Sequence, residues 1–262
     1  MRNLLHLFTR RISGILACCG VTFIAACSHN QSAIDPMAIT TVKPGAILLY
    51  TGAGTSEGDT AALEKILQRH EFTYTTLDSA QLNAMSVSQL RTHQLLLVPG
   101  GNFVEIGKGL APATSAHIRN AVANGLNYLG ICAGAFFAGH SPYNGLNLTN
   151  GVVFRFYAAE AQGIRKMAVW VQAAGELPLQ HYWEDGPTLT GWGDVVAKYP
   201  DGTPAIVEGN LGEGWVVLSG IHPEAPEDWR GGMTFTTPAS LDNEYAAKLI
   251  DAALRRTPLA HF

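Results

Sequence analysis

Short apolar runs alternate with amphipathic segments over the first half of the chain, a pattern typical of an α/β domain with a parallel sheet. Runs of strand length cover residues 46–50, 72–77, 94–98 and 128–131. Between them, residues 59–70, beginning at the capping residue Asp59, and residues 113–124 place apolar side chains at helical spacing. Parallel sheets carry their sites at the carboxyl ends of the strands, so the loops after these runs are where we look for chemistry.

The pattern changes after residue 141, where the strand-like segments are separated by turn-forming residues. These segments are residues 152–158, 167–173, 193–199, 205–208 and 214–219. Turns such as Pro200-Asp201-Gly202 predict hairpins, and therefore antiparallel additions to the sheet. Residues 241–256 close the chain as an amphipathic helix.

The first 26 residues have the features of an export signal rather than of a folded element. Arg2, Arg10 and Arg11 precede an uncharged apolar run that ends in Ala25-Ala26-Cys27. This segment resembles a bacterial lipoprotein signal, in which cleavage leaves Cys27 as a lipidated amino terminus. The apolar run is shorter than the roughly 20 residues of a transmembrane helix. The alternatives are an uncleaved anchor and an ordinary cleaved signal.

The resemblance to lipoproteins implies a location and an organisation for the rest of the chain. Ser28 follows the cysteine, and the absence of aspartate there implies the outer membrane, with the protein facing the periplasm. Residues 27–44 are polar and contain two prolines, as in a flexible tether. We therefore expect a signal peptide over residues 1–26, a tether over residues 27–44 and one domain over residues 45–258.

Charge and cysteine usage narrow the class of function. Removal of the signal, which carries three positive charges, would change the formal net charge from −4 to −7. The sequence has no lysine- or arginine-rich run, so we expect no nucleic-acid partner. Cys132 would be the one free cysteine of the exported domain, and a lone thiol in an oxidising compartment indicates a task for it.

The segment Gly130-Ile131-Cys132-Ala133-Gly134 has the pattern of a nucleophile elbow, G-x-nucleophile-x-G, between a strand and a helix. In such an elbow the cysteine takes a positive φ at the carboxyl edge of the sheet, and the start of the helix stabilises a thiolate. The alternative is that Cys132 is a small buried apolar residue.

Two further segments supply partners for a cysteine nucleophile. The run of residues 214–221 delivers His222 at the end of a strand, and Glu224, two residues later, projects to the same side. A base beside the thiol and a carboxylate beside that base are what cysteine catalysis requires. Pro99-Gly100-Gly101-Asn102 follows a buried strand, and the N–H groups of Gly101 and Ala133 form a candidate oxyanion hole.

These three segments, in their order and spacing, resemble the class I glutamine amidotransferase-like superfamily. Most similar is the amino-terminal domain of eukaryotic biotin–protein ligases, which also occurs free-standing in bacteria. The resemblance implies a flavodoxin-like, mostly parallel sheet flanked by helices, and a Cys132-His222-Glu224 triad. It also implies that Gly100, Asn102 and Phe136 contact the substrate.

One residue departs from the pattern of the resembled superfamily. Glutamine amidotransferases carry glutamine two residues past the second elbow glycine, where this chain has Phe136. We therefore expect negligible glutaminase activity. No ATP-binding signature or ligase domain is visible in the sequence, so biotinylation is not expected either.

The sequence favours a membrane-anchored cysteine hydrolase or transferase acting on an amide-type carbon of a small molecule or peptide. A cysteine peptidase acting on small peptides or cell-wall fragments is the second enzyme interpretation. A non-catalytic ligand-binding or thiol-sensing lipoprotein is the alternative from another class. We expect no cofactor and no metal, and the sequence indicates no oligomeric state.

Overall fold

The protein is described here from a computed structural model, in which residues 46–262 are placed well enough to describe. The signal peptide, the tether and Cys27 lie outside the described residues. The described part is an α/β fold built on a nine-stranded sheet, as the sequence predicts. Within residues 46–262, no helix combines the length and the apolar character that a membrane crossing needs.

The sheet has a parallel half and an antiparallel half that meet at the strand that ends just before His222. The strand order is β2-β1-β3-β4-β11-β10-β9-β6-β7. The first five strands in this order are parallel to one another, and the remaining pairs are antiparallel. The parallel strands are β1 (Ile47–Tyr50), β2 (Tyr74–Leu77), β3 (Leu95–Val98), β4 (Asn127–Ile131) and β11 (Gly214–Ser219). The antiparallel additions are β10 (Pro204–Leu211), β9 (Asp194–Lys198), β6 (Lys166–Ala173) and β7 (Leu179–Glu184).

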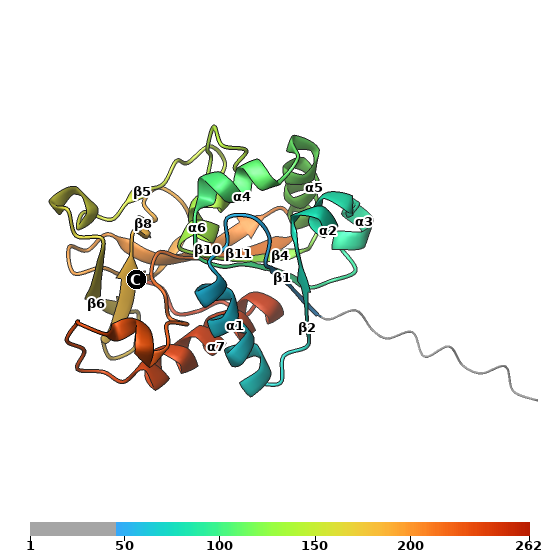
Figure 1. Ribbon diagram of the computed structural model, residues 1–262. Helices are drawn as coiled ribbons and strands as arrows, with labels where there is room; N and C mark the ends of the chain where they lie inside the picture. Colours follow the sequence, from blue (N-terminus) through green and yellow to red (C-terminus); the bar gives the residue numbers. More distant parts are fainter. Residues whose placement is uncertain (1–45) are drawn as a thin grey trace, which may run out of the picture. The chain divides into compact units, whose positions relative to one another are not determined.

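Helices cover both faces of the parallel half, as Figure 1 shows. One face carries α1 (Glu57–Arg69) and α7 (Ala239–Arg255), which pack on Ile47 and Leu49. The opposite face carries five helices, which pack on Leu48 and Tyr50. They are α2 (Ser79–Ala84), α3 (Val87–Leu90), α4 (Phe103–Gly109), α5 (Pro112–Ala123) and α6 (Ala133–Ala138). Successive residues of β1 thus face opposite layers, which is why the strand is apolar throughout.

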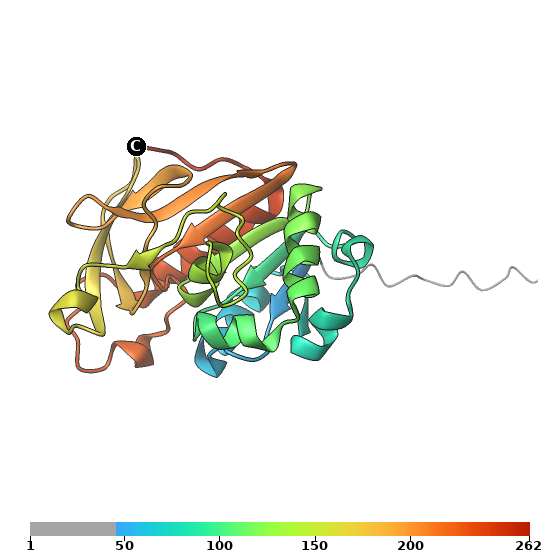
Figure 2. The same ribbon diagram turned by 90° about the horizontal axis from the view of Figure 1, so that it is seen from above.

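The antiparallel half extends the sheet beyond these helices, as the view from above in Figure 2 shows. A small separate sheet pairs β5 (Arg155–Phe156) with β8 (Pro187–Thr188). Two short 3₁₀ helices complete the fold, η1 (Glu160–Gln162) and η2 (Glu227–Arg230).

Most predicted elements agree with the structure in type. Helix α4 was not predicted, and the strand expected over residues 152–158 is reduced to β5 in the separate sheet. Two further differences concern α1 and β7. Ser56, and not Asp59, is the N-cap of α1, because the Ser56 side chain accepts a hydrogen bond from the N–H of Asp59. Strand β7 was not predicted from the sequence, although its inner residues are all buried. Both differences concern residues of the candidate site.

Candidate active site

Cys132 lies in a sharp turn between β4 and α6, with a φ of 48° and a ψ of −102°. The elbow glycines are required by close packing. A Cβ on Gly134 would lie 2.1 Å from the carbonyl oxygen of Val98, and one on Gly130 would lie 2.5 Å from the carbonyl oxygen of Gly134. The predicted strand–turn–helix elbow is confirmed, and it sets Cys132 at the carboxyl edge of the sheet.

The thiol lies at a cavity of about 240 Å³ that residues from both halves of the sheet enclose. Its lining residues are Ser56, Asp59, Gly101, Cys132, Glu184, Asp185 and His222. Cys132 is 5% exposed, and its Sγ donates a hydrogen bond to the main-chain oxygen of Glu184 at 3.4 Å. The end of β7 thus forms the wall of the cavity opposite the elbow.

His222 reaches the same cavity because β11 runs parallel to β4. Ser219 is in register with Ile131, so the chain after β11 emerges beside Cys132. The main-chain N–H of His222 then donates to the oxygen of Tyr182 in β7, at 2.9 Å. The predicted base and the predicted nucleophile therefore line one cavity.

Two carboxylates, and not one, hold the His222 ring. Its Nδ1 lies 2.9 Å from Oε1 of Glu224 and 3.0 Å from Oδ1 of Asp59. His222, Glu224 and Asp59 are each at most 5% exposed. The predicted His222–Glu224 contact is present, and Asp59 is an additional partner that the sequence pattern presents only as a helix cap.

Gly100 makes room for this arrangement and does not reach the cavity itself. A Cβ at position 100 would lie 2.1 Å from Oδ1 of Asp59 and 2.7 Å from Cε1 of His222. Only glycine lets these two side chains meet there. The Pro-Gly-Gly sequence is the signal that could have pointed to a close approach after β3, although not to Asp59.

The charges around the imidazole determine its protonation. Burial lowers the pKa of His222, but the negative charges of Cys132, Glu224 and Asp59 outweigh burial and hold that pKa well above its ordinary value. Burial raises the pKa of Glu224 to about 6, against the opposing charge of His222. Burial also acts on Asp59, yet the charge of His222 and its hydrogen bond leave the pKa of Asp59 below its ordinary value.

The other imidazole nitrogen is available to a ligand. Nε2 of His222 is buried and has no hydrogen-bond partner among residues 46–262. In particular, no hydrogen bond joins it to Sγ of Cys132 in the described part of the chain. With Nδ1 held by carboxylates, Nε2 is the nitrogen that can exchange a proton at the cavity.

The two backbone N–H groups of the predicted oxyanion hole lie in different elements. The N–H groups of Gly101 and Ala133 donate to no acceptor in the described residues. Gly101 lines the cavity and takes a φ of 137°. Ala133 is the first residue of α6. The next residue, Gly134, donates its N–H to the oxygen of Pro99 at 3.1 Å. Both donors are therefore unused near the thiol.

Asn102 and Phe136 do not line the cavity. The Asn102 side chain caps α4 by accepting from the N–H groups of Val104 and Glu105. The Phe136 ring lies 4.9 Å from those of Phe103 and Phe156, beside a separate pocket of about 140 Å³. Each side chain is thus engaged away from the thiol, and the contact of each with the substrate stays a prediction.

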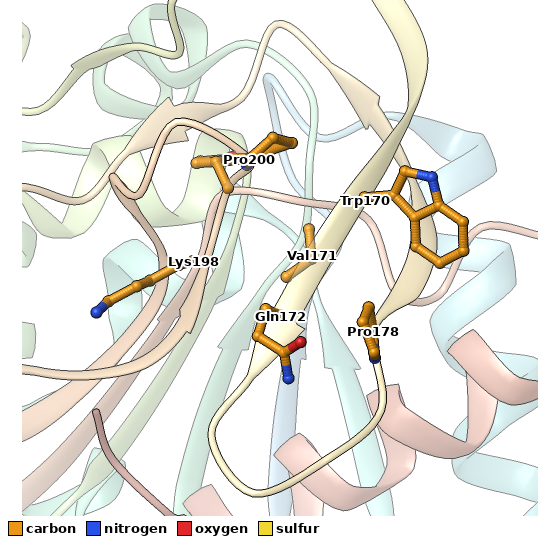
Figure 3. Close-up of a pocket in the computed structure, with 7 residues that line it drawn as sticks. Trp170, Val171, Gln172, Pro178, Lys198 and Pro200 are labelled. Carbon is orange, nitrogen blue, oxygen red and sulfur yellow. The ribbon is translucent and has the colours of Figure 1, made fainter.

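A more apolar pocket lies away from the thiol, in the antiparallel half of the sheet (Figure 3). Its volume is about 340 Å³, and Trp170, Gln172 and Lys198 are among the residues that line it. Trp170, 44% exposed, belongs to this pocket and not to the cavity of Cys132. Among its lining residues the pocket has no cysteine, serine, histidine or carboxylate, so it is not the candidate active site.

The same cluster around His222 offers three atoms that could in principle converge on a metal ion. Ligand atoms of Asp59, His222 and Glu224 all lie within 4.8 Å of one another. However, the contacts of Nδ1 with the two carboxylates have hydrogen-bond length, so a metal would have to replace the Nδ1 hydrogen. The arrangement as it stands is an imidazole whose Nδ1 is hydrogen-bonded to Glu224 and lies within ion-pair distance of Asp59.

Comparisons with known proteins match part of the sequence to a family and the fold to solved structures. Residues 45–152 match the family described as "Biotin-protein ligase, N terminal". A crystal structure of a glutamine amidotransferase has a TM-score of 0.57 at 19% identity, over 80% of this chain and 99% of that one. A protein of Thermoplasma acidophilum, proposed to be part of a GMP synthase, has a TM-score of 0.50 at 12% identity, over 81% of this chain and 96% of the other.

A relative in Chlamydia muridarum, an uncharacterized protein, is 34% identical over 158 residues, which is 51% of this chain. The chain spans 61% of the length of that curated relative. The fold of the described residues is thus that of the glutamine amidotransferase-like proteins. Residues 45–152 are similar to the biotin–protein ligase N-terminal family. The family match contains Cys132 but ends before Glu184, His222 and Glu224.

Proposed function

We propose that the protein is a cysteine-dependent hydrolase or acyl transferase acting on an amide-type carbon. The observation that carries the proposal is the shared cavity: Cys132, at an elbow with a φ of 48°, and His222, held by two carboxylates, line the same space. A nucleophile and an oriented base beside one cavity are the minimum for covalent catalysis.

In the proposed reaction, Nε2 of His222 takes the thiol proton of Cys132. The Sγ then attacks the carbonyl carbon, forming the C–S bond and an oxyanion that the N–H groups of Gly101 and Ala133 would stabilise. The C–N bond breaks as the imidazolium returns its proton to the leaving nitrogen. Water, or a second amine for a transferase, then attacks the carbonyl carbon of the thioester and the C–S bond breaks. The proton that the attacking group gives up passes through His222 to the sulfur, which restores the thiol.

Glu224 and Asp59 have supporting roles in this scheme. Glu224 is hydrogen-bonded to Nδ1, and Asp59 lies 3.0 Å from the same nitrogen, so the two carboxylates together fix the orientation of the ring. They also stabilise the imidazolium that forms when the thiol ionises. Asp59 therefore joins the predicted Cys132-His222-Glu224 set as a positioning residue.

The size of the cavity favours a small group over a long peptide segment. Its volume of about 240 Å³ is below the roughly 300–1,000 Å³ of ordinary ligand pockets. A small amide or the end of a short peptide fits this space better than the middle of a chain. The peptidase interpretation is thereby narrowed to chain ends.

The test uses p-nitrophenyl acetate, a small activated acyl donor, with the full-length protein. We expect release of p-nitrophenol and an acetyl group on the Cys132 peptide, detected by mass spectrometry. Cys132→Ala should abolish both, and His222→Ala should slow them by about 10²–10⁴-fold. Parallel incubation with free glutamine should release no more ammonia than a blank, because position 136 lacks the glutamine that glutamine amidotransferases carry there.

Two results would overturn the proposal. One is acetyl transfer that survives Cys132→Ala. The other is a wild type that stays unacetylated at Cys132 while N-acetylcysteine in the same buffer reacts. Robust ammonia release from glutamine would leave the nucleophile in place and refute the expected exclusion of glutamine.

A further inference from the structure

The cavity of Cys132 has an unusual charge balance. Three of its seven lining residues are carboxylates, namely Asp59, Glu184 and Asp185, and none is lysine or arginine. A cavity lined by one sign of charge attracts ligands of the other sign. Whether it does so here depends on which of the three carboxylates are neutralised within the protein.

Two of the three carboxylates have cationic partners. Asp59 faces His222 at 3.0 Å. Asp185 pairs with Arg165 at 2.6 Å, and the Arg165 side chain is 63% exposed at the rim. The negative charges of Asp59 and Asp185 are therefore largely neutralised by these partners.

Glu184 is the carboxylate left without a cation. In the described part of the chain, its side chain has one hydrogen-bond partner, the neutral hydroxyl of Tyr182, which donates to Oε2 at 2.5 Å. Burial, and then this contact with Glu184, raise the pKa of Tyr182, which keeps the phenol a donor. The Tyr182 ring is itself fixed between His222 and Trp229, at ring distances of 5.8 and 5.6 Å. The Glu184 carboxylate is thus held in place.

The main chain of Glu184 lies close to the reacting atom, while the residue is exposed at the end of β7 and lines the cavity. Its own main-chain oxygen accepts from Sγ of Cys132 at 3.4 Å. The unpaired nitrogen of His222 is a second feature of the cavity that indicates a ligand. Nε2 is buried without a partner in the described residues, and His222 is only 4% exposed. An acceptor for a cation and a nitrogen that can exchange a proton therefore lie at the same cavity.

We propose that the cavity takes an amide whose acyl part carries a positively charged amino group, and that Glu184 receives this group. The inference rests on the proposed function and specifies its substrate class. An α-amino group is two bonds from the carbonyl carbon that the sulfur would attack, so the amino group and the reacting carbon fit one small cavity. Amides of amino acids and the amino-terminal residue of short peptides belong to this class.

The test compares two thiol reagents of opposite charge and similar size, with the full-length protein. These are 2-aminoethyl methanethiosulfonate, a cation, and 2-sulfonatoethyl methanethiosulfonate, an anion. In both, the thiolate attacks the thiosulfonate sulfur, forms a mixed disulfide and releases methanesulfinate. The rate of modification is read from the Cys132 peptide by mass spectrometry, and each rate is divided by that for N-acetylcysteine.

We expect the normalised ratio of cation to anion to be at least about tenfold in the wild type, within the range of electrostatic steering. Glu184→Gln should reduce this ratio several-fold, because the amide keeps the hydrogen bond to Tyr182 but not the charge. Glu213→Gln is the matched control: it also removes one negative charge, but it lies at the turn before β11, at the opposite end of that strand from His222. It should leave the ratio unchanged.

The two proposals fail in distinguishable ways. A ratio near one, or a ratio that Glu184→Gln and Glu213→Gln change equally, overturns the charge inference whatever the absolute rates are. A Cys132 that discriminates between the reagents but transfers no acetyl group from p-nitrophenyl acetate overturns the proposed function and leaves a cation-selective cavity.

Discussion

Two carboxylates on one imidazole nitrogen raise the question of which one carries the negative charge. Nδ1 of His222 has one hydrogen, and it lies almost equally far from Glu224 and from Asp59. Like charges this close disfavour ionisation of both. The pKa of Glu224 is raised to about 6, first by burial, whereas that of Asp59 is below its ordinary value because of His222. Asp59 therefore stays ionised over a wider pH range than Glu224.

This difference predicts unequal effects of Asp59→Asn and Glu224→Gln. At pH 5 most of Glu224 is already protonated in the wild type. Cys132 of the Glu224→Gln variant should therefore be acetylated at close to the wild-type rate at this pH. As the pH rises through about 6, the wild type gains a second carboxylate and should outpace Glu224→Gln. Asp59→Asn should be slower at every pH, by about 10–100-fold, as expected for loss of an orienting partner.

The measurement is the rate of Cys132 acetylation by p-nitrophenyl acetate between pH 5 and 8. Asp201→Asn, in the exposed turn before β10, is a control that removes a carboxylate far along the chain from the site. A purely structural role for Asp59 would lower the amount of folded protein without changing the shape of the pH profile. If acetylation at pH 5 is slower in Glu224→Gln than in Asp59→Asn, then Glu224, and not Asp59, is the carboxylate that stays ionised at low pH.

The parallel half of the fold could be predicted from the sequence because its strands are continuous apolar runs. Helix α4 and strand β7 were missed for different reasons. Helix α4 contains Gly107 and Gly109, which weaken a helical pattern, and it depends on the Asn102 cap and on close packing of Gly107 against Tyr143. Strand β7 mixes histidine, aromatic and acidic residues, and its inner residues are buried on both faces, so no alternation is visible.

The missed strand explains the missed residues of the site. Tyr182 and Glu184 belong to β7, and nothing in the sequence fixes where the end of that strand lies relative to Cys132. Asp59 was assigned as a helix cap, which a carboxylate before an apolar helical pattern normally is. By contrast, Cys132 and His222 were predictable, because each closely follows an apolar strand of the parallel half.

The segment after Glu224 closes one side of the site and depends on a buried ion pair. Trp229, in η2, lies 6.1 Å from the His222 ring. The next residue, Arg230, donates to Asp242 of α7 at 2.6 Å and to the oxygen of Thr237 at 2.7 Å. Asp242 is fully buried, and His181, which lies 3.5 Å from it, is buried as well.

Arg230→Ala should lower the free energy of unfolding by about 3–5 kcal/mol at pH 8, since it leaves the Asp242 charge buried and unpaired. Burial, opposed by Arg230, raises the pKa of Asp242 to about 7. A carboxyl with a raised pKa contributes stability that is fully present below its ordinary pKa of 3.8 and is lost as the pH rises from there through about 7. Without Arg230 that pKa rises further, so the loss should be smaller at pH 5.

Urea unfolding at pH 5 and pH 8, followed by tryptophan fluorescence, checks this prediction. Arg91→Ala, at an exposed arginine, is the matched control and should change the free energy of unfolding by no more than about 0.5 kcal/mol. An equal loss for Arg230→Ala at both pH values would show that Asp242 does not titrate in this range. A loss no larger than that of Arg91→Ala would show that the ion pair does not hold the segment.

The candidate site is assembled from both halves of the chain, although the family match covers only one. Cys132, Gly101 and Asp59 come from residues 45–152, whereas His222, Glu224 and Glu184 come from the unmatched remainder. The pairing of β11 with β4 brings the two sets together, because it places the ends of both strands at one edge. A variant of the second half can therefore disable the site without touching any residue that the family match includes.

The predicted lipid anchor concerns residues 1–44, outside the described part of the chain, and remains a proposal based on the sequence. We propose that residues 1–26 are removed and that Cys27 carries lipid. A single acyl chain gives only marginal membrane binding, so a stable anchor needs at least two chains on the mature amino terminus. Electrostatic attraction to the membrane cannot replace a second chain, because a mature protein with a formal charge of −7 is repelled by anionic lipid surfaces.

The wild type, expressed in a Gram-negative host, should therefore partition into the detergent phase of a Triton X-114 extract and show the mass of an acylated chain that begins at Cys27. Cys27→Ser should keep residues 1–26 or enter the aqueous phase, because the lipid acceptor is gone. Cys132→Ser, which alters a cysteine of the folded domain, should partition like the wild type. Recovery of the wild type in the aqueous phase, with no acyl chain in its intact mass, would disprove the anchor and leave the proposals for Cys132 and Glu184 unaffected, since they depend only on residues 46–262.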